Sequence, residues 1–133
     1  MAQQSLAGKV ALITGGGRGI GRAIALRLAA DKARLVLAAR TQRELDSVAE
    51  EVRTLGATAL SVPADVGRGP AVKALFQKAV AAFGQVDVLV NNAGTYPIGA
   101  VADFPEDAWD AAMRVNLKAF YLCSRAALTA GRM

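Results

Sequence analysis

The sequence contains 133 residues, of which 53% are hydrophobic and 5% aromatic, and its net charge is +5. This length suits one domain with its own core, is too short for two ordinary domains, and with this apolar content argues against disorder. The 16 basic residues are spread among 11 acidic ones, and no basic run is interleaved with aromatic residues, so we expect no nucleic-acid partner. Because histidine is absent and cysteine occurs once, a catalytic metal held by these ligands is excluded.

No apolar run approaches the length needed to cross a bilayer, and the N-terminal residues do not resemble a secretory leader. We therefore expect a soluble, cytoplasmic protein without a membrane partner. Cys123 cannot form an internal disulfide, and no histidine is present to activate it. We interpret it as a reduced thiol on a helix.

Four short apolar runs alternate with helical patterns along the chain. These runs are typical of strands buried on both faces of a parallel sheet, and they cover residues 9–14, 34–39, 57–62 and 86–90. Strands and helices that alternate with short connections predict right-handed βαβ units. The sequence therefore predicts an α/β, Rossmann-like, doubly wound parallel sheet in a single domain over residues 1–133.

The first two helices have clear sequence signals. The first follows a glycine-rich turn, and its predicted apolar face consists of Ile20, Ile24 and Leu28. The second opens with the capping box Thr41-x-x-Glu44 and ends at Gly56.

The third helix is predicted to begin at Gly69 and Pro70 and to end at Gly84. Its apolar stripe comprises Val72, Leu75, Phe76, Ala79, Val80 and Phe83. A last helical stretch is predicted from about Pro105 to the C-terminus.

The glycine-rich turn, TGGGRGIG at residues 14–21, lies between the first strand and the first helix. Small residues at this place let the backbone approach a pyrophosphate, whose charge is favoured by the free N–H groups and dipole of the helix N-terminus. The spacing Gly15-x-x-x-Gly19-x-Gly21 is not a strict G-x-G-x-x-G, so a purely structural turn remains the alternative. The strand–turn–helix context favours nucleotide binding.

The end of the second strand bears on which cofactor is preferred. Folds that bind NAD usually place an acid there for the ribose 2′-hydroxyl, whereas this sequence reads LAART and has Arg40. Arg40 could bind a 2′-phosphate, and Arg18 in the glycine turn could reach the same group. Both residues favour NADP(H) over NAD(H); the alternative is two solvent-exposed arginines.

Three motifs in order resemble the N-terminal half of the short-chain dehydrogenase/reductase family, of the type that includes 3-oxoacyl-carrier-protein reductases. They are TGGGRGIG, Asp65-Val66 after the third strand and NNAG at residues 91–94 after the fourth. The resemblance covers essentially the whole chain. It implies hydride transfer between a nicotinamide cofactor and a small carbonyl or alcohol substrate.

The same resemblance implies roles for individual residues. The cofactor phosphates and ribose would be held by Gly15, Arg18, Gly19, Ile20 and Gly21. The adenine would be bordered by Asp65 and Val66, and the adenosine ribose and the path toward the nicotinamide would be lined by Asn92, Ala93 and Gly94. We interpret Asn91 as a residue that ties strand ends together.

Asn116 shares a helix face with Met113 and Phe120, and a polar amide on an apolar stripe needs hydrogen-bond partners. The resemblance implies that it is the family's catalytic Asn, which orders a water of the proton relay. The alternative is an amide that satisfies a neighbouring backbone group.

The family's catalytic Ser, Tyr and Lys follow the helix that contains Asn116, and they are absent from these 133 residues. Tyr121 and Arg125 imitate the Tyr-x-x-x-Lys spacing on a different helix, so we interpret Tyr121 as a helix-packing residue. Lys32 stands where many relatives have a helix-ending glycine. Two functions stay open: the cofactor half of an oxidoreductase, and a non-catalytic dinucleotide-binding or assembly module.

The expected strand order 3-2-1-4 leaves the fourth strand at the edge of a truncated sheet. An apolar edge invites pairing with another chain. The last helix would present further unpartnered apolar residues, namely Leu117, Phe120, Tyr121 and Leu128. We therefore expect a homo-oligomer or part of a longer polypeptide.

Overall fold

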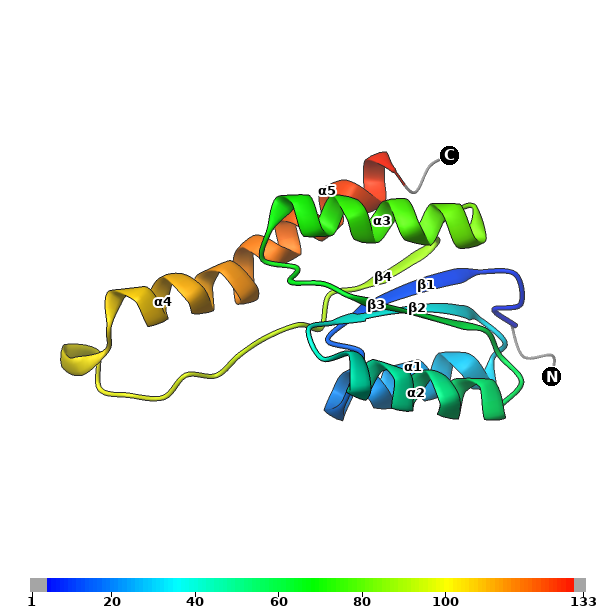
Figure 1. The fold of residues 1–133 in the computed structure, drawn as a ribbon, viewed down its shortest axis with the longest axis horizontal. Helices are drawn as coiled ribbons and strands as arrows, with labels where there is room; N and C mark the ends of the chain where they lie inside the picture. Colours follow the sequence, from blue (N-terminus) through cyan, green and yellow to red (C-terminus); the bar gives the residue numbers. More distant parts are fainter. Residues whose placement is uncertain (1–4, 131–133) are drawn as a thin grey trace.

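The computed structural model describes residues 5–130 and contains one parallel sheet with helices on both faces (Figure 1). The strands are β1 Val10–Thr14, β2 Arg34–Ala39, β3 Ala59–Pro63 and β4 Val88–Val90, in the order β3-β2-β1-β4. Every neighbouring pair is parallel. The predicted fold class and strand order are confirmed.

Helices α1 Gly19–Ala30 and α2 Gln42–Thr54 cover one face of the sheet, and α3 Gly69–Phe83 and α5 Ala119–Thr129 cover the other (Figure 1). The buried side chains form two clusters, one on each face of the sheet. β1 is buried along its whole length because it lies between two strands and two helical layers.

The apolar face of α1 differs from the prediction. Ile20 is 69% exposed, and Ile24 and Leu28 are only half-buried. The residues of α1 that face the sheet are small and recur every fourth position: Gly21, Ala25 and Ala29. They allow α1 to lie close to the sheet, and the larger residues are displaced to the sides.

The boundaries of α2 and α3 agree with their signals. Thr41 occupies the N-cap position of α2, although its side chain makes no capping hydrogen bond. Pro70 lies in the first turn of α3, and Gly84 ends this helix in the left-handed conformation at φ 86°. The predicted stripe of α3 is buried at Val72, Leu75, Phe76 and Ala79.

Both later strands begin two residues after their predicted starts. Before β3, the Ala57 N–H donates to the carbonyl of Val52 and so completes the end of α2. Before β4, the carboxylate of Asp87 accepts a hydrogen bond from the Val10 N–H at 2.9 Å, which replaces a strand pairing. Local side-chain and helix-end bonds therefore shorten these strands.

After β4 the chain leaves the sheet as a long extended segment and returns through a projecting helix (Figure 1). A 3-10 turn at Val101–Asp103 precedes α4 Glu106–Met113, a π-helical stretch at Arg114–Lys118 and α5. The predicted last helix is thus interrupted by one wider turn. It ends at Thr129, and the predicted continuation over residues 131–133 lies outside the described residues.

Candidate dinucleotide-binding site

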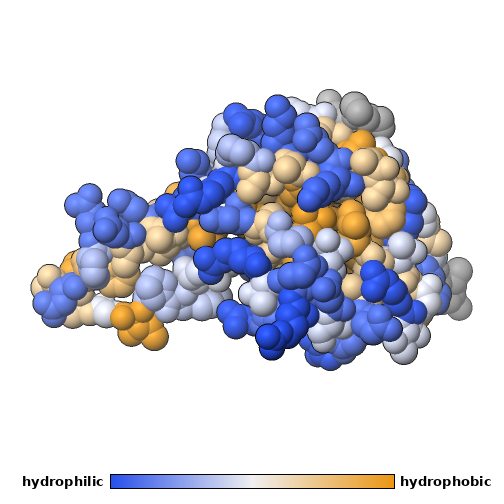
Figure 2. Space-filling view, viewed as in Figure 1, coloured by the Kyte–Doolittle hydropathy of each residue, from blue (hydrophilic) through white to orange (hydrophobic). Residues whose placement is uncertain are grey.

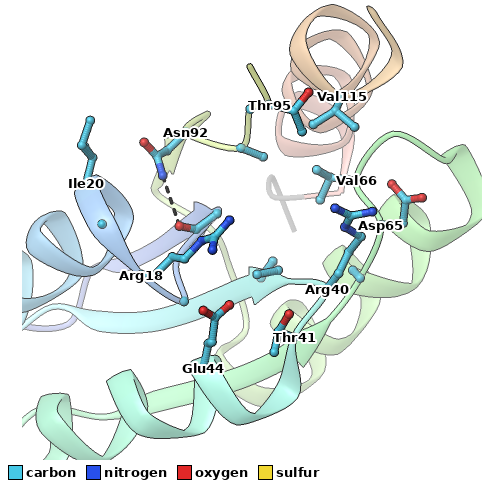
Figure 3. A pocket seen from close by; sticks show the side chains of 18 of the residues that line it. Arg18, Ile20, Arg40, Thr41, Glu44, Asp65, Val66, Asn92, Thr95 and Val115 are labelled. Atoms are coloured by element: carbon cyan, nitrogen blue, oxygen red, sulfur yellow. Dashed lines mark hydrogen bonds between the residues drawn. The ribbon is translucent and has the colours of Figure 1, made fainter. Parts of the chain in front are cut away.

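A cleft of about 450 Å³ opens at the carboxyl ends of the parallel strands (Figure 3). Its walls come from the glycine turn, the ends of β2 and β3, the segment after β4 and the π-helical stretch. It is lined by Gly15, Gly17, Arg18, Gly19, Ile20, Ala38, Ala39, Arg40, Thr41, Glu44, Ala64, Asp65, Val66, Asn92, Ala93, Gly94, Thr95, Tyr96 and Val115. Nearly all the predicted cofactor residues therefore lie around one cavity.

The glycine turn is tightly packed on its inner side. Gly15 has φ +65°, and a Cβ there would lie 2.9 Å from Nδ2 of Asn92. A Cβ at Gly21 would overlap the carbonyl oxygen of Gly15 and lie 2.7 Å from the same Nδ2. Gly21 does not itself line the cleft, and its role is to let α1 begin against the end of β1.

The outer side of the turn is open. Gly19 has φ +55°, and no atom lies within 4 Å of the position that a Cβ would occupy. Gly19 is also the first residue of α1, whose first N–H groups have no partner within the helix. This part of the cleft therefore offers backbone donors and the positive end of the α1 dipole to an anion.

Arg18 and Arg40 flank the cleft from two different elements. Arg18 is the N-cap residue of α1 and Arg40 follows β2, and both are exposed (Figure 3). Within residues 5–130 neither guanidinium makes a hydrogen bond or an ion pair, whereas nearby Arg22 is paired with Glu51. That pairing raises the pKa of Arg22 and lowers the pKa of Glu51 through their shared hydrogen bond.

The Asp65-Val66 motif forms the wall beyond β3. The Asp65 carboxylate accepts hydrogen bonds from the Gly67 N–H at 3.0 Å and from Nε of Arg68 at 3.1 Å. These bonds fix the turn that leads into α3, so that Val66, which is 6% exposed, faces the cleft from a rigid support.

Thr14, Asn92 and Ala93 join the ends of β1 and β4. The buried hydroxyl oxygen of Thr14 accepts hydrogen bonds from the Asn92 and Ala93 N–H groups, both at 3.0 Å. Nδ2 of Asn92 donates to the carbonyl of Gly15 at 3.2 Å. The floor of the cleft is thus cross-linked to the glycine turn by side chains about 77 residues apart in sequence.

The prediction that Asn91 ties strand ends together is wrong. Its Nδ2 instead donates to the hydroxyl of Ser124 on α5 at 3.3 Å. Successive side chains of an extended chain point to opposite sides, so Asn92 faces the glycine turn and Asn91 faces α5. Thr14 was missed by the sequence reasoning, although a polar residue that ends a wholly apolar strand was a usable signal.

Asn116 lies in the middle of the π-helical stretch and holds the segment after NNAG. Its Oδ1 accepts from the Thr95 N–H at 2.8 Å, and its Nδ2 donates to the Thr95 carbonyl at 2.9 Å. A Cβ at Gly94 would lie 3.2 Å from the same Oδ1. The amide of Asn116 therefore satisfies both backbone groups of Thr95.

Tyr121 is 54% exposed and is not part of the core, so it is one of the unpartnered apolar residues expected on the last helix. Its hydroxyl accepts a hydrogen bond from Nη1 of Arg125 at 2.9 Å, and this guanidinium lies 5.1 Å from the ring centroid. The two residues therefore contact each other one turn apart on the outer side of α5. Tyr121 does not line the cleft.

Comparison with known proteins identifies the chain. The family model for short chain dehydrogenase matches residues 9–132. The chain belongs to the short-chain dehydrogenase family. Versicolorin reductase stcU of Emericella nidulans is 42% identical over 123 residues, which cover 92% of this chain and 47% of that protein. The hydroxynaphthalene reductase-like protein Arp2 of Metarhizium anisopliae is 38% identical over 125 residues, with the same two coverages.

Solved structures of short-chain dehydrogenases share the fold. A metagenomic short-chain oxidoreductase in complex with NADP has a TM-score of 0.90 and 43% identity, and the match covers 96% of this chain and 58% of that one. A short-chain type dehydrogenase/reductase from Mycobacterium marinum has a TM-score of 0.92 and 33% identity, with coverages of 95% and 51%. The chain thus spans about half the length of the relatives named here.

The described residues lack two further features. Among residues 5–130, no helix is long and apolar enough to cross a membrane. Over the same range, no group of three His, Cys, Asp or Glu residues is placed to hold a metal ion.

Proposed function

We propose that this chain is the NADP(H)-binding portion of a short-chain oxidoreductase, which transfers a hydride between a nicotinamide cofactor and a carbonyl or alcohol substrate. The observation that carries this proposal is the cleft itself. It combines an open glycine turn at a helix N-terminus with two arginines, Arg18 and Arg40, that have no partner within residues 5–130. Residues 1–133 then form one dinucleotide-binding domain, the N-terminal half of a longer family domain.

The described residues fit a dinucleotide. A pyrophosphate needs backbone donors and space. Both are present at Gly19, where no atom lies within 4 Å of the position that a Cβ would take. We assign the phosphates and ribose to Gly15, Arg18, Gly19 and Ile20, with Gly21 acting indirectly by letting α1 lie close to the turn. We assign the adenine to Asp65 and Val66, and the adenosine ribose and the route to the nicotinamide to Asn92, Ala93 and Gly94. When bound, the nicotinamide ring would supply or accept the hydride.

The preference for NADP(H) rests on charge. A 2′-phosphate at the adenosine end would meet two guanidinium groups, which can form charge-assisted, forked hydrogen bonds. The related metagenomic oxidoreductase solved in complex with NADP supports this assignment by similarity.

A direct test is to titrate the chain with NADPH and NADH by fluorescence. We expect NADPH to bind more tightly, and we expect Arg18→Ala and Arg40→Ala each to weaken NADPH binding about tenfold or more, with a much smaller effect on NADH. Arg43→Ala is the matched control, because this exposed arginine lies on the first turn of α2 outside the cleft. Tighter binding of NADH by the unmodified chain would refute the role of both arginines.

We assign Asn116 a catalytic-site role, in which it orders a water of the proton relay. Its two bonds to Thr95 use one donor and one acceptor position, and the amide group retains a further position of each kind. Asn116→Asp keeps the shape and removes the donor. We expect it to lower the turnover of the longer enzyme more than it weakens NADPH binding.

A non-catalytic dinucleotide-binding or assembly module is the second candidate function. In the 133 residues the only Tyr-x-x-x-basic spacing is that of Tyr121 and Arg125, and Tyr121 lies outside the cleft. The mass of the intact native protein and its NADPH consumption with small ketones would discriminate the two. A longer protein that consumes NADPH supports the enzyme; a protein of this length that only binds NADPH supports the module.

We further propose that the protein is cytoplasmic and forms a homo-oligomer. The homo-oligomer is supported by the apolar surface on the outer side of the π-helical stretch and α5, where Leu117, Phe120 and Tyr121 are each more than half exposed. Light scattering and cell fractionation test the two parts of this statement separately.

A further inference from the structure

The cleft contains a carboxylate as well as two arginines. Glu44 lies in the first turn of α2 and is half-buried at the wall of the cleft. In Figure 3 its carboxylate is directed into the cleft, on the side of Arg18. The sequence had indicated Glu44 only as the partner of Thr41 in a capping box, and the structure shows no side-chain capping bond at Thr41.

The glycine turn packs against the base of this side chain. A Cβ at Gly17 would lie 3.1 Å from Cβ of Glu44, so the glycine turn rests directly on the stem of Glu44. Arg18 follows Gly17 in the chain and lines the same cleft. Across residues 5–130 the carboxylate of Glu44 makes neither a hydrogen bond nor an ion pair, and it is free to bind a ligand.

The position also sustains a negative charge. Glu44 is the acidic residue of the first turn of α2, where the free N–H groups and the helix dipole stabilise a carboxylate. A carboxylate only accepts hydrogen bonds, so it pairs with a ribose hydroxyl and repels a phosphate dianion. It therefore acts on NADH and NADPH in opposite directions.

We propose that Glu44 is a specificity-determining residue, which accepts a hydrogen bond from the adenosine ribose 2′-hydroxyl and lets the cleft take NADH as well as NADPH. This inference rests on the proposed function. Arg18 and Arg40 attract the 2′-phosphate of NADPH, and Glu44 opposes them. In NADH that phosphate is missing, and the carboxylate of Glu44 accepts a hydrogen bond from the ribose 2′-hydroxyl. Glu44 on α2 then does what an acid at the end of β2 usually does.

Glu44→Gln tests the proposal with an isosteric change that keeps the packing against Gly17. Fluorescence titrations should show NADH binding about tenfold more weakly, because a charged acceptor is lost, and NADPH binding about threefold more tightly, because a repulsion is lost. The ratio of the two affinities should therefore change about thirtyfold. Glu50→Gln is the matched control on the same helix, since Glu50 is exposed and lies outside the cleft, and it should leave both affinities unchanged.

Glu44→Asp is a second variant, which keeps the charge and shortens the stem. It should retain weak NADPH repulsion and lose most of the NADH bond, so its affinity ratio should lie between those of the unmodified chain and Glu44→Gln. Circular dichroism melting would verify that all variants are folded.

Different outcomes overturn different statements. An unchanged NADPH-to-NADH ratio in a folded Glu44→Gln variant overturns the role of Glu44 and leaves the proposed function intact. The same holds if the unmodified chain binds NADPH but shows no NADH binding at millimolar concentration. If it binds neither cofactor, the proposed function fails, and the role of Glu44 fails with it.

Discussion

The N-terminal segment, residues 10–83, and the C-terminal segment, residues 94–130, use apolar side chains differently. In the first, the large hydrophobic residues bury themselves on both faces of the sheet, and its exposed ones are Ile20 and Leu55. In the second, exposed large hydrophobic residues recur throughout: Tyr96, Ile98, Val101, Trp109, Leu117, Phe120, Tyr121 and Leu128. Figure 2 shows hydrophobic residues at the surface of the projecting part that carries α4.

The difference shows that an apolar pattern specifies a buried face only where a second surface is available to cover it. α3 and α5 each bury about a quarter of their residues in the core, yet only α5 also exposes large hydrophobic residues, namely Phe120, Tyr121 and Leu128. β4 pairs with β1 alone and is only half-buried along its length. The C-terminal segment therefore presents surfaces suited to association.

The largest expected effect lies in the glycine turn. Gly21→Ala would place a Cβ against the carbonyl of Gly15 and 2.7 Å from Nδ2 of Asn92, both of which are fixed by the strand-end hydrogen bonds. We expect the free energy of unfolding to fall by about 3 kcal/mol and NADPH binding to be lost. Urea unfolding and fluorescence titration measure the two effects.

Gly69→Ala is the control, because it begins α3 and its nearest neighbour would be Leu122 Cδ2 at 4.0 Å. We expect a change in stability within about 0.5 kcal/mol. Equal effects of the two substitutions would contradict the close packing of α1 on the end of β1.

The exposed face of the C-terminal segment is tested by Leu117→Ser combined with Phe120→Ser. These residues line a groove of about 460 Å³ with Met113 and Tyr121. We expect self-association measured by light scattering to weaken more than tenfold, with little loss in the stability of the monomer, because both side chains are already more than half exposed.

Leu55→Ser provides the comparison from the N-terminal segment, since Leu55 is exposed at the end of α2. It should leave self-association unchanged. A chain that is monomeric before any substitution would remove the proposal of a homo-oligomer.

The buried side of α5 is tested through Cys123, whose side chain has no exposed surface. Burial raises the pKa of this thiol from 9.0 to about 11. The folded state therefore keeps the proton between pH 9 and 11, while the unfolded state loses it, so stability is lost as the pH rises through this window. The loss should reach about 2 kcal/mol near pH 11.

Cys123→Ala removes the titrating thiol. The difference in unfolding free energy between the unmodified chain and this variant therefore separates the effect of the thiol from that of other groups. We expect the difference to be constant below pH 8 and to shift in favour of the alanine variant above pH 9. A constant difference up to pH 11 would show that the thiol is accessible to water.

Sequence reasoning recovered what depends on local signals. The strand order, the ends of α3 and the position of the cleft all followed from apolar runs, Pro70, Gly84 and the glycine turn. It was wrong about the face of α1, because how closely a helix approaches a sheet depends on small residues such as Ala25 rather than on the largest ones.

The parts that sequence reasoning missed depend on contacts between distant residues. The bonds from Thr14 to the chain after β4 span almost 80 positions, so the polar end of β1 indicates that Thr14 needs a partner but not which residues supply it. The direction of Glu44 depends on how α2 meets the glycine turn, and the wider turn around Asn116 interrupts a helical pattern that shows no proline or glycine.

The smallest expected effect tests an unusual backbone conformation inside the N-terminal segment. Lys32 has φ +73°, the one positive φ of a non-glycine residue within residues 5–130, and it follows the end of α1. Glycine adopts this conformation without the steric penalty of a Cβ. Lys32→Gly should therefore raise the free energy of unfolding by about 1 kcal/mol, although it removes the bond from Nζ to the Leu55 carbonyl at 3.3 Å. Lys32→Ala loses the same bond and keeps the strained backbone, so thermal unfolding should rank glycine above lysine and lysine at or above alanine. An alanine variant as stable as the glycine variant would show that the backbone at this position carries no strain.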